Sequence, residues 1–234
     1  YTTLFRSGIK QFCGNGQYAD LAVFSFHPVK HIACGEGGMI TTNNKNLYQK
    51  LLLLRSHGIS RDCNTFSNSA TFANAEDRED FPGWYMEMQM LGYNYRLTDF
   101  QAALGISQLK RANQGLARRR EIATKYDEAF KNISGIKAPH RDQISGSEHA
   151  FHLYVIQAKN RLRLYNHLKE NNIYSQIHYI PAHLMPYYRS LGWKEGDLPI
   201  SENYYKHCLS LPMYPSLSDP ELNFVIDKVL EFYR

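Results

Sequence analysis

The sequence lacks the features that mark several protein classes. No apolar run approaches the roughly 20 residues that a membrane-spanning helix needs, so we expect no membrane association. None of the ten histidines stands in a His-Glu-x-x-His pattern, and the sequence therefore predicts no metal centre. The cysteines show neither a Cys-x-x-Cys pair nor the spacing of a disulfide framework, which favours reduced thiols in a cytoplasmic protein; they are Cys13, Cys34, Cys63 and Cys208.

The chain also lacks a large excess of charge of either sign. The chain has 27 Lys and Arg against 22 Asp and Glu, a net charge of +5, which would help attract an anionic substrate but does not single out nucleic acid. Arg118, Arg119 and Arg120 form the one notable basic cluster, and a solvated helix face is its simplest interpretation. A nucleic-acid-binding module remains an alternative, although it would require a steeply salt-dependent affinity.

The most informative stretch is VFSFHPVKHI, residues 23–32. It predicts a short buried strand, an abrupt turn at Pro28 and a lysine, Lys30, just beyond the turn. The glycine cluster GEGG follows at residues 35–38, and a second strand-like run covers residues 39–42. A lysine fixed in this way suits an amine that must meet a carbonyl in one orientation, because a desolvated lysine loses its proton readily and forms a Schiff base.

The rest of the chain predicts an alternation of strands and helices. Residues 21–26 are apolar almost throughout, which is typical of a strand buried on both faces of a parallel sheet. Residues 60–84 are polar and irregular, and we expect a long surface loop there. Further strands are expected at 150–158 and 173–180. Helices are expected after the caps Asn43 or Asn44, from the capping box Thr98-x-x-Gln101 to about Lys131 with a bend near 113–115, over 160–170, and from Ser218-x-x-Glu221 onward.

The stretch SFHPVKHI, together with the following GEGG, resembles the cofactor-lysine motif of the DegT-type sugar aminotransferases. The resemblance is strongest to the branch that acts in pseudaminic acid biosynthesis. It implies an α/β protein of fold type I, the aspartate aminotransferase-like fold of transferases that depend on pyridoxal phosphate (PLP). The matching segments continue in order along nearly the whole chain: RSHGI at 55–59, LGYNYRLTD at 91–99, QAALG at 101–105 and HYIPAH at 178–183.

The resemblance also implies how the chain is divided. Residues 1–110 would be the C-terminal part of the PLP-binding large domain, and residues 111–234 a complete small α/β domain. The aromatic ring that stacks on the cofactor and the aspartate that pairs with its pyridine nitrogen would lie upstream, so we expect this chain to be the C-terminal portion of a longer enzyme and to be inactive alone. Residues 1–7 do not resemble the family, which suggests foreign or misread sequence.

The resemblance assigns roles to individual residues. Lys30 would bind PLP covalently and act as the catalytic residue, and Ser25 would offer its hydroxyl to the cofactor phosphate. Asn94 would reach the phosphate of a neighbouring subunit in a homodimer. Arg96 would assist cofactor binding, or serve as a structural ion-pair partner. His178, Tyr179 and His183 would face the nucleotide-sugar, although three polar residues that end a strand are the plain alternative.

The function implied is transfer of an amino group to a nucleotide-linked 4-keto-6-deoxy sugar, giving a 4-amino sugar, with glutamate as the expected donor. Sugar dehydratases of the same fold carry histidine where this chain has Lys30, which favours transamination over dehydration. A dehydratase and a truncated, inactive fragment that only binds or dimerises remain the alternatives.

Overall fold

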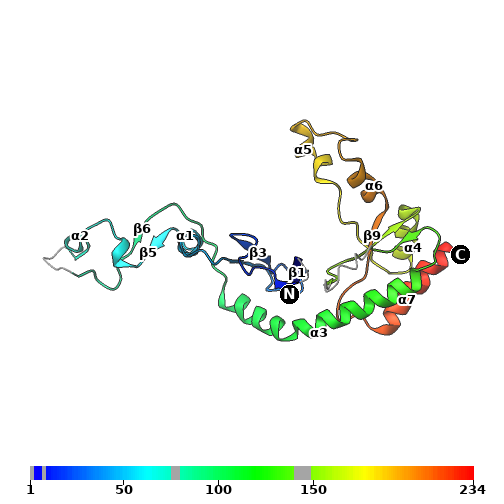
Figure 1. Cartoon of the computed structure of the whole chain (residues 1–234), viewed down its shortest axis with the longest axis horizontal. Coiled ribbons are helices and arrows are strands. Elements are labelled where there is room, and N and C mark those ends of the chain that lie inside the picture. The colour runs from blue at the N-terminus through cyan, green and yellow to red at the C-terminus, as the bar shows by residue number, and fades with distance from the viewer. Residues whose placement is uncertain (1–2, 7–8, 75–79, 140–148) are drawn as a thin grey trace. The chain divides into compact units, whose positions relative to one another are not determined.

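The computed structural model describes residues 3–6, 9–74, 80–139 and 149–234 (Figure 1). The chain folds as two compact units. We call Gln11–Leu109 the N-terminal unit, and Tyr1–Lys10 together with Lys110–Arg234 the C-terminal unit. The first strand, β1 (Thr3–Arg6), belongs to the C-terminal unit, and its partner β2 (Ile9–Phe12) crosses the boundary between the units after Lys10. The identity of the two predicted domains stays a prediction.

The strand before Lys30 is present but is not buried on both faces. β3 (Ala22–Ser25) pairs with β4 (Gly38–Thr41) in an antiparallel register that sets Ser25 opposite Gly38. Exposure alternates along β3, and the side chain of Val23 is 76% exposed. The expectation of a strand inside a parallel sheet is therefore wrong for the described residues, because β4 is the one strand they place beside β3.

The N-terminal unit also contains a helix and a second antiparallel strand pair. The side chain of Asn44 caps α1 (Lys45–Arg55) by accepting hydrogen bonds from the backbone N–H groups of Asn46 and Leu47, as the sequence predicts. β5 (Ile59–Ser60) then pairs with β6 (Glu87–Met88). The predicted surface loop between them is partly helical, with a 3-10 turn η1 at Cys63–Thr65 and α2 at Ala70–Asn74.

One long helix belongs to both units. α3 (Asp99–Phe130) is unbroken through residues 113–115. Its start confirms the predicted capping box, because the backbone N–H of Thr98 donates to Gln101 Oε1 over 3.0 Å and the backbone N–H of Gln101 donates to Thr98 Oγ1 over 3.4 Å. These reciprocal bonds satisfy donors that would otherwise be left open at the helix start.

The C-terminal unit holds the main hydrophobic core. Its antiparallel sheet has the order β7 (Ile136–Lys137), β8 (Tyr154–Ala158), β9 (Cys208–Leu211). The fully buried core side chains come from this sheet and from three helices that pack on it: the C-terminal half of α3, α4 (Arg161–Glu170) and α7 (Asp219–Tyr233). The predicted capping box of α7 is confirmed in full.

Other expectations for this unit were wrong. The predicted strand at 173–180 forms only one bridge, between Gln176 and Ser210. The strand that the sheet uses instead, β9, and the helix before it, α6 (Pro199–His207), were not predicted. Two short helices, η2 (Ala182–Leu184) and α5 (Pro186–Ser190), lie between Gln176 and α6 in the sequence.

The arginine cluster is not a solvated face. Arg119 is buried and donates hydrogen bonds to the backbone carbonyls of Phe151, at 3.0 Å, and Met213, at 2.9 Å. Arg118 contacts Glu121 and Asp219 at 2.8 and 2.7 Å. The cluster therefore holds α3 to the rest of its unit, and the nucleic-acid alternative loses its only support.

Within the described part of the chain, no helix combines the length and the apolar composition that crossing a membrane requires. The same residues contain no group of three or more His, Cys, Asp or Glu arranged to hold a metal ion.

Candidate cofactor and substrate site

The loop that carries Lys30 is closed at its base by the backbone. The N–H of Phe26 donates to the carbonyl of Gly37 over 2.8 Å, and the N–H of Cys34 donates to the carbonyl of Phe26 over 2.9 Å. Inside this base, the N–H of Lys30 donates to the carbonyl of His27 over 2.9 Å. The turn expected at Pro28 is therefore present, and it fixes the backbone of Lys30 directly after the β3 strand.

The side chain of Lys30 is available for a ligand. It is exposed, and among the described residues it has no ion-pair partner and no side-chain hydrogen bond. The sequence argument expected a desolvated lysine; no described residue covers the turn, and desolvation of Lys30 in the longer enzyme stays a prediction. Ser25 is also exposed, and its Oγ accepts a hydrogen bond of 3.4 Å from the N–H of His27.

The glycine cluster is needed for close approach. A Cβ on Gly38 would lie 2.8 Å from the carbonyl oxygen of Phe24. Gly37 has a φ of +143°, and a Cβ there would lie 2.7 Å from Leu97 Cδ1. Next to it, Gln101 Nε2 donates to the carbonyl of Glu36 over 2.8 Å. The loop that follows Lys30 therefore packs against the start of α3.

The segment that carries Asn94 is held by backbone bonds to the end of α1. The N–H of His57 donates to the carbonyl of Tyr93 and the N–H of Tyr93 donates to the carbonyl of Leu54, both over 2.7 Å. A Cβ on Gly92 would lie 2.2 Å from the backbone nitrogen of Gly58, so only glycine allows this approach. These contacts fix the backbone on both sides of Asn94.

The side chains of this segment divide between its two sides. The rings of Tyr93 and Tyr95 stack with their centroids 4.7 Å apart and an interplanar angle of 8°. Asn94 lies between them in the sequence, and the two-residue alternation of an extended chain directs it to the other side. The exposed side chains of Asn94 and Arg96 have no hydrogen-bond or ion-pair partner among the residues described, so the structural ion pair that we considered for Arg96 is not formed there.

Glu87 organises the loop before this segment, and no pattern in the sequence indicates this role. Its carboxylate accepts hydrogen bonds from the backbone N–H of Ser67 at 2.6 Å and of Asn68 at 2.9 Å, from Tyr85 Oη at 2.9 Å and from Gln89 Nε2 at 3.0 Å. Desolvation raises the pKa of Glu87, but the hydrogen bonds to its charged form outweigh desolvation and lower the pKa to about 2.

The network continues toward Asn94 through the backbone. The N–H of Gln89 donates to the carbonyl of Gly58 over 2.7 Å, directly beside the close contact between Gly58 and Gly92. The hydrogen bonds of Glu87 and the backbone bonds around Asn94 therefore belong to one connected hydrogen-bond network.

The candidate residues of the C-terminal unit differ in exposure. His178 is partly buried, its Nδ1 lies 2.7 Å from Ser210 Oγ, and burial lowers its pKa. Tyr179 is 71% exposed and is therefore accessible to a ligand.

His183 is buried, and its Nε2 lies 2.9 Å from Glu202 Oε1. The same carboxylate accepts the backbone N–H of Gly196 at 2.9 Å. The hydrogen bond from His183 is the main reason that the pKa of Glu202 is lowered. In this structure His183 therefore holds the chain between η2 and α6, and its predicted contact with substrate stays a prediction.

The residues present fit PLP at the Lys30 loop. A phosphate-bearing aldehyde needs an amine with no other partner and several hydrogen-bond donors near it. The described structure supplies the unpaired amine of Lys30 and the exposed hydroxyl of Ser25 beside one turn, and the unpaired donors of Asn94 and Arg96 in the segment leading to α3.

Comparison with known proteins agrees with this chemistry. The model of the DegT/DnrJ/EryC1/StrS aminotransferase family matches residues 11–230. The spore coat polysaccharide biosynthesis protein SpsC of Bacillus subtilis is 40% identical over 94% of this chain and 55% of its own length. UDP-4-amino-4,6-dideoxy-N-acetyl-β-L-altrosamine transaminase of Campylobacter jejuni is 36% identical over 91% of this chain and 52% of its own length. The chain thus spans about half the length of the curated relatives it matches.

Solved structures give the same result. Helicobacter pylori PseC, an aminotransferase involved in the biosynthesis of pseudoaminic acid, matches with a TM-score of 0.80 and 28% identity over 99% of this chain and 56% of PseC. The PMP form of the sugar aminotransferase Spr1654 from Streptococcus pneumoniae matches with a TM-score of 0.77 and 27% identity over 92% of this chain and 53% of its own. Aminotransferases of this family use pyridoxal phosphate, and the fold is fold type I. With its strand-turn-lysine loop and these matches, the chain belongs to the DegT/DnrJ/EryC1/StrS aminotransferase family.

Proposed function

We propose that this protein takes part in PLP-dependent transfer of an amino group to the C4 ketone of a nucleotide-linked 4-keto-6-deoxy sugar, with glutamate as donor. The observation that carries the proposal is the unpaired amine of Lys30 on a turn fixed directly after β3, within a family of sugar aminotransferases. The name of the Campylobacter jejuni relative, a transaminase of a UDP-linked 4-amino-4,6-dideoxy sugar, supports the position of amination.

Each candidate residue has a defined part in this proposal. When bound, pyridoxal phosphate supplies the electron sink for the reaction. Lys30 Nζ binds the cofactor and then carries the proton that moves between carbon atoms during amino transfer. Ser25 Oγ donates to the cofactor phosphate, and Asn94 donates to the phosphate bound by the second subunit of a homodimer. Arg96 adds positive charge close to Asn94 in the sequence.

The substrate would be held by the C-terminal unit. Tyr179, which is exposed, offers an aromatic face and a hydroxyl to the nucleotide-sugar. His178 is partly buried beside Ser210, and burial favours its neutral form, which can accept as well as donate a hydrogen bond. His183 is also proposed to contact the nucleotide-sugar, and its hydrogen bond to Glu202 fixes the backbone of that loop.

The experiment is an assay of both half-reactions with the full gene product. Incubation with glutamate and a UDP-linked 4-keto-6-deoxy sugar is expected to yield equal amounts of 2-oxoglutarate and a 4-amino sugar, identified by mass and by NMR. Lys30→Ala is expected to abolish the product. Loss of the sugar 3-hydroxyl as water without incorporation of nitrogen would instead establish a dehydratase, and binding without either reaction would establish a binding protein.

A further inference from the structure

Ser56 lies directly opposite Asn94 in an isolated antiparallel bridge. The backbone N–H of His57 donates to the carbonyl of Tyr93 over 2.7 Å, and the N–H of Tyr95 donates over 2.9 Å to the carbonyl of the residue that precedes Ser56. These bonds flank the bridge, so Ser56 and Asn94 are a non-hydrogen-bonded pair. In such a pair the two Cα atoms are only about 4.5 Å apart, and the two side chains stand close together on one face.

The hydroxyl of Ser56 is its one polar group without a partner. The backbone N–H of Ser56 donates to the carbonyl of Leu53 over 3.0 Å, and its carbonyl accepts the N–H of Ile59 over 3.1 Å. The side chain is half-buried, and its Oγ has no hydrogen-bond partner among the described residues. The adjoining side chain of Asn94 is exposed and equally unpartnered there. Two hydrogen-bonding side chains thus stand side by side with their capacity unused.

The backbone around Ser56 fixes the direction of its side chain. His57 has a φ of +62°, in the left-handed region that residues with a Cβ rarely adopt. Gly58 follows with a φ of +69°, and a Cβ on it would clash with the carbonyl oxygen of Met90. The chain therefore turns sharply directly after Ser56 and is pressed against the segment that leads to Asn94. This turn keeps the pair in register.

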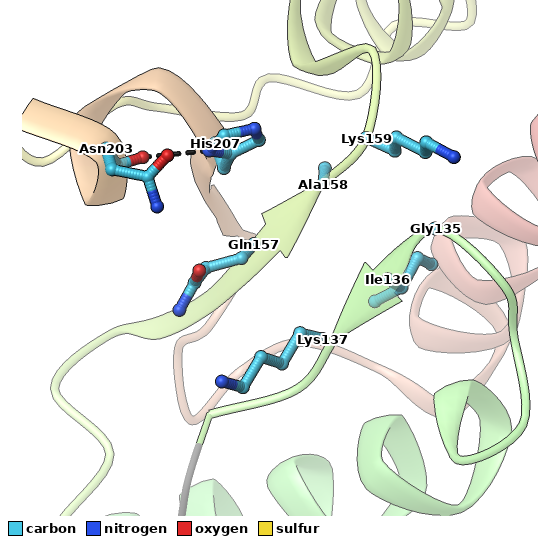
Figure 2. Close-up of a pocket in the computed structure, with 8 residues that line it drawn as sticks. All are labelled: Gly135, Ile136, Lys137, Gln157, Ala158, Lys159, Asn203 and His207. Carbon is cyan, nitrogen blue, oxygen red and sulfur yellow. Dashed lines mark hydrogen bonds between the residues drawn. The ribbon is translucent and has the colours of Figure 1, made fainter.

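Such a pairing is not found wherever polar side chains gather. The hollow of about 330 Å³ between β7, β8 and α6 is lined by two lysines, Lys137 and Lys159, but their side chains extend in opposite directions (Figure 2). They do not converge on one ligand. Ser56 and Asn94 differ from them because a backbone bridge sets the two residues opposite each other.

We propose that Ser56 and Asn94 form one anion site, in which the Ser56 hydroxyl donates a second hydrogen bond to the cofactor phosphate that Asn94 is proposed to bind. The inference rests on the proposed function, which supplies the phosphate. A phosphate group presents several acceptor oxygens, so two neighbouring donors can each bond a different oxygen. Because one bridge holds both residues, their backbones are already ordered before the anion binds, which lowers the entropic cost of binding.

The test compares pyridoxal phosphate with pyridoxal, which lacks the phosphate, on the full gene product. Absorbance titration gives the Kd of each compound. Ser56→Ala is expected to raise the Kd for pyridoxal phosphate at least about threefold, because a hydrogen bond to a charged group is lost, and to leave the Kd for pyridoxal within about twofold. The substitution breaks no side-chain hydrogen bond within the described chain, so the variant is expected to fold normally.

Two further variants serve as controls for this test. Ser56→Thr keeps a hydroxyl and is expected to recover most of the lost affinity for pyridoxal phosphate. Ser107→Ala makes the same chemical change at an exposed position of α3 and is expected to change neither Kd.

Asn94→Ala separates this inference from the proposed function, and it is expected to weaken the binding of pyridoxal phosphate but not of pyridoxal. If it does so while Ser56→Ala has no effect, the second donor is refuted and the proposed role of Asn94 stands. Equal weakening of both compounds in Ser56→Ala would show that Ser56 acts through the shape of the turn, which also overturns the inference. An unchanged Kd for pyridoxal phosphate in Asn94→Ala would overturn the role proposed for Asn94 and the shared site with it.

Discussion

The two units of this chain differ in where they keep their apolar side chains. In the C-terminal unit, side chains such as Tyr126, Tyr154 and Leu168 are fully buried in one core. In the described part of the N-terminal unit, Cys34 is the one hydrophobic residue classed as buried, and large side chains are open to solvent: Phe100 at 90%, Leu91 at 85% and Val23 at 76%.

This difference shows that the main hydrophobic core and the candidate cofactor residues lie in different units of the chain. The C-terminal unit gains its stability from an area of apolar surface removed from water. The N-terminal unit, which carries Lys30, Ser25 and Asn94, has its local geometry set by backbone hydrogen bonds, glycine contacts and the Glu87 network. Substitutions in the two units should therefore change different measurable quantities.

The largest effect is expected from the core. Leu168→Ala removes a fully buried side chain from α4 and should lower the free energy of unfolding by about 2–5 kcal/mol. Leu91→Ala, a matched change at a side chain that is 85% exposed, should change it by less than about 0.5 kcal/mol. Urea unfolding followed by circular dichroism measures both. Equal losses of unfolding free energy in the two variants would show that Leu91 is buried in solution and would contradict the difference between the two units.

A smaller effect is expected from the buried pair of the C-terminal unit. His183→Ala leaves the buried Glu202 carboxylate without its imidazole partner and should lower Tm by roughly 5 °C at pH 7. The pKa of Glu202 is lowered in the folded state, so its contribution is present above the ordinary glutamate range and is lost as pH falls through the folded pKa. The Tm difference between the variant and the unmodified chain should therefore shrink in acid. A pH-independent difference would show that lost packing, and not the hydrogen bond to Glu202, is responsible.

A local effect is expected at Glu87. Glu87→Gln replaces a carboxylate that accepts four hydrogen bonds, and amide hydrogen exchange at Ser67 and Asn68 should become at least about threefold faster. Its folded pKa of about 2 lies below the ordinary glutamate value, so protection is present above the unfolded pKa and is lost as pH falls toward 2. Glu128→Gln, at an exposed position, serves as the control. Unchanged exchange at Ser67 in the Glu87 variant would contradict the assigned network.

The smallest effect on stability is expected at the site itself. Arg96→Ala removes an exposed side chain that has no partner among the described residues, and it should change the free energy of unfolding by less than about 0.5 kcal/mol. The same variant of the full gene product should bind pyridoxal phosphate more weakly, as measured by absorbance titration. A loss of stability without a loss of cofactor affinity would assign Arg96 to the fold and not to the site.

Local sequence signals predicted the parts of the fold that local chemistry determines. The caps at Asn44, Thr98 and Ser218 and the turn at Pro28 are formed by neighbouring residues, and each lies where the pattern placed it. The pairing of Gln176 with Ser210 and of β8 with β9 joins residues distant in sequence, and short patterns carry no information about such partners.

The same limit applies to the candidate site. The motif around Lys30 predicted a fixed lysine after a strand, and the resemblance supplied Ser25 and Asn94. The bonds of Glu87 to Ser67 and Asn68, about twenty residues away, and of Glu202 to His183 depend on tertiary structure, so the sequence could not indicate them. The exposure of β3 was not predicted, because its apolar composition suggested burial on both faces, whereas β3 pairs only with β4 in the described chain.

The central claim, that Lys30 is the cofactor lysine, has a direct test. The full gene product is incubated with pyridoxal phosphate, reduced with borohydride, digested and mapped by mass spectrometry. We predict that the cofactor mass lies on Lys30, and that Lys30→Ala abolishes both the label and the characteristic absorbance of the bound cofactor. A label of equal yield on another lysine, such as Lys45 or Lys50, retained in the Lys30→Ala variant, would contradict the account.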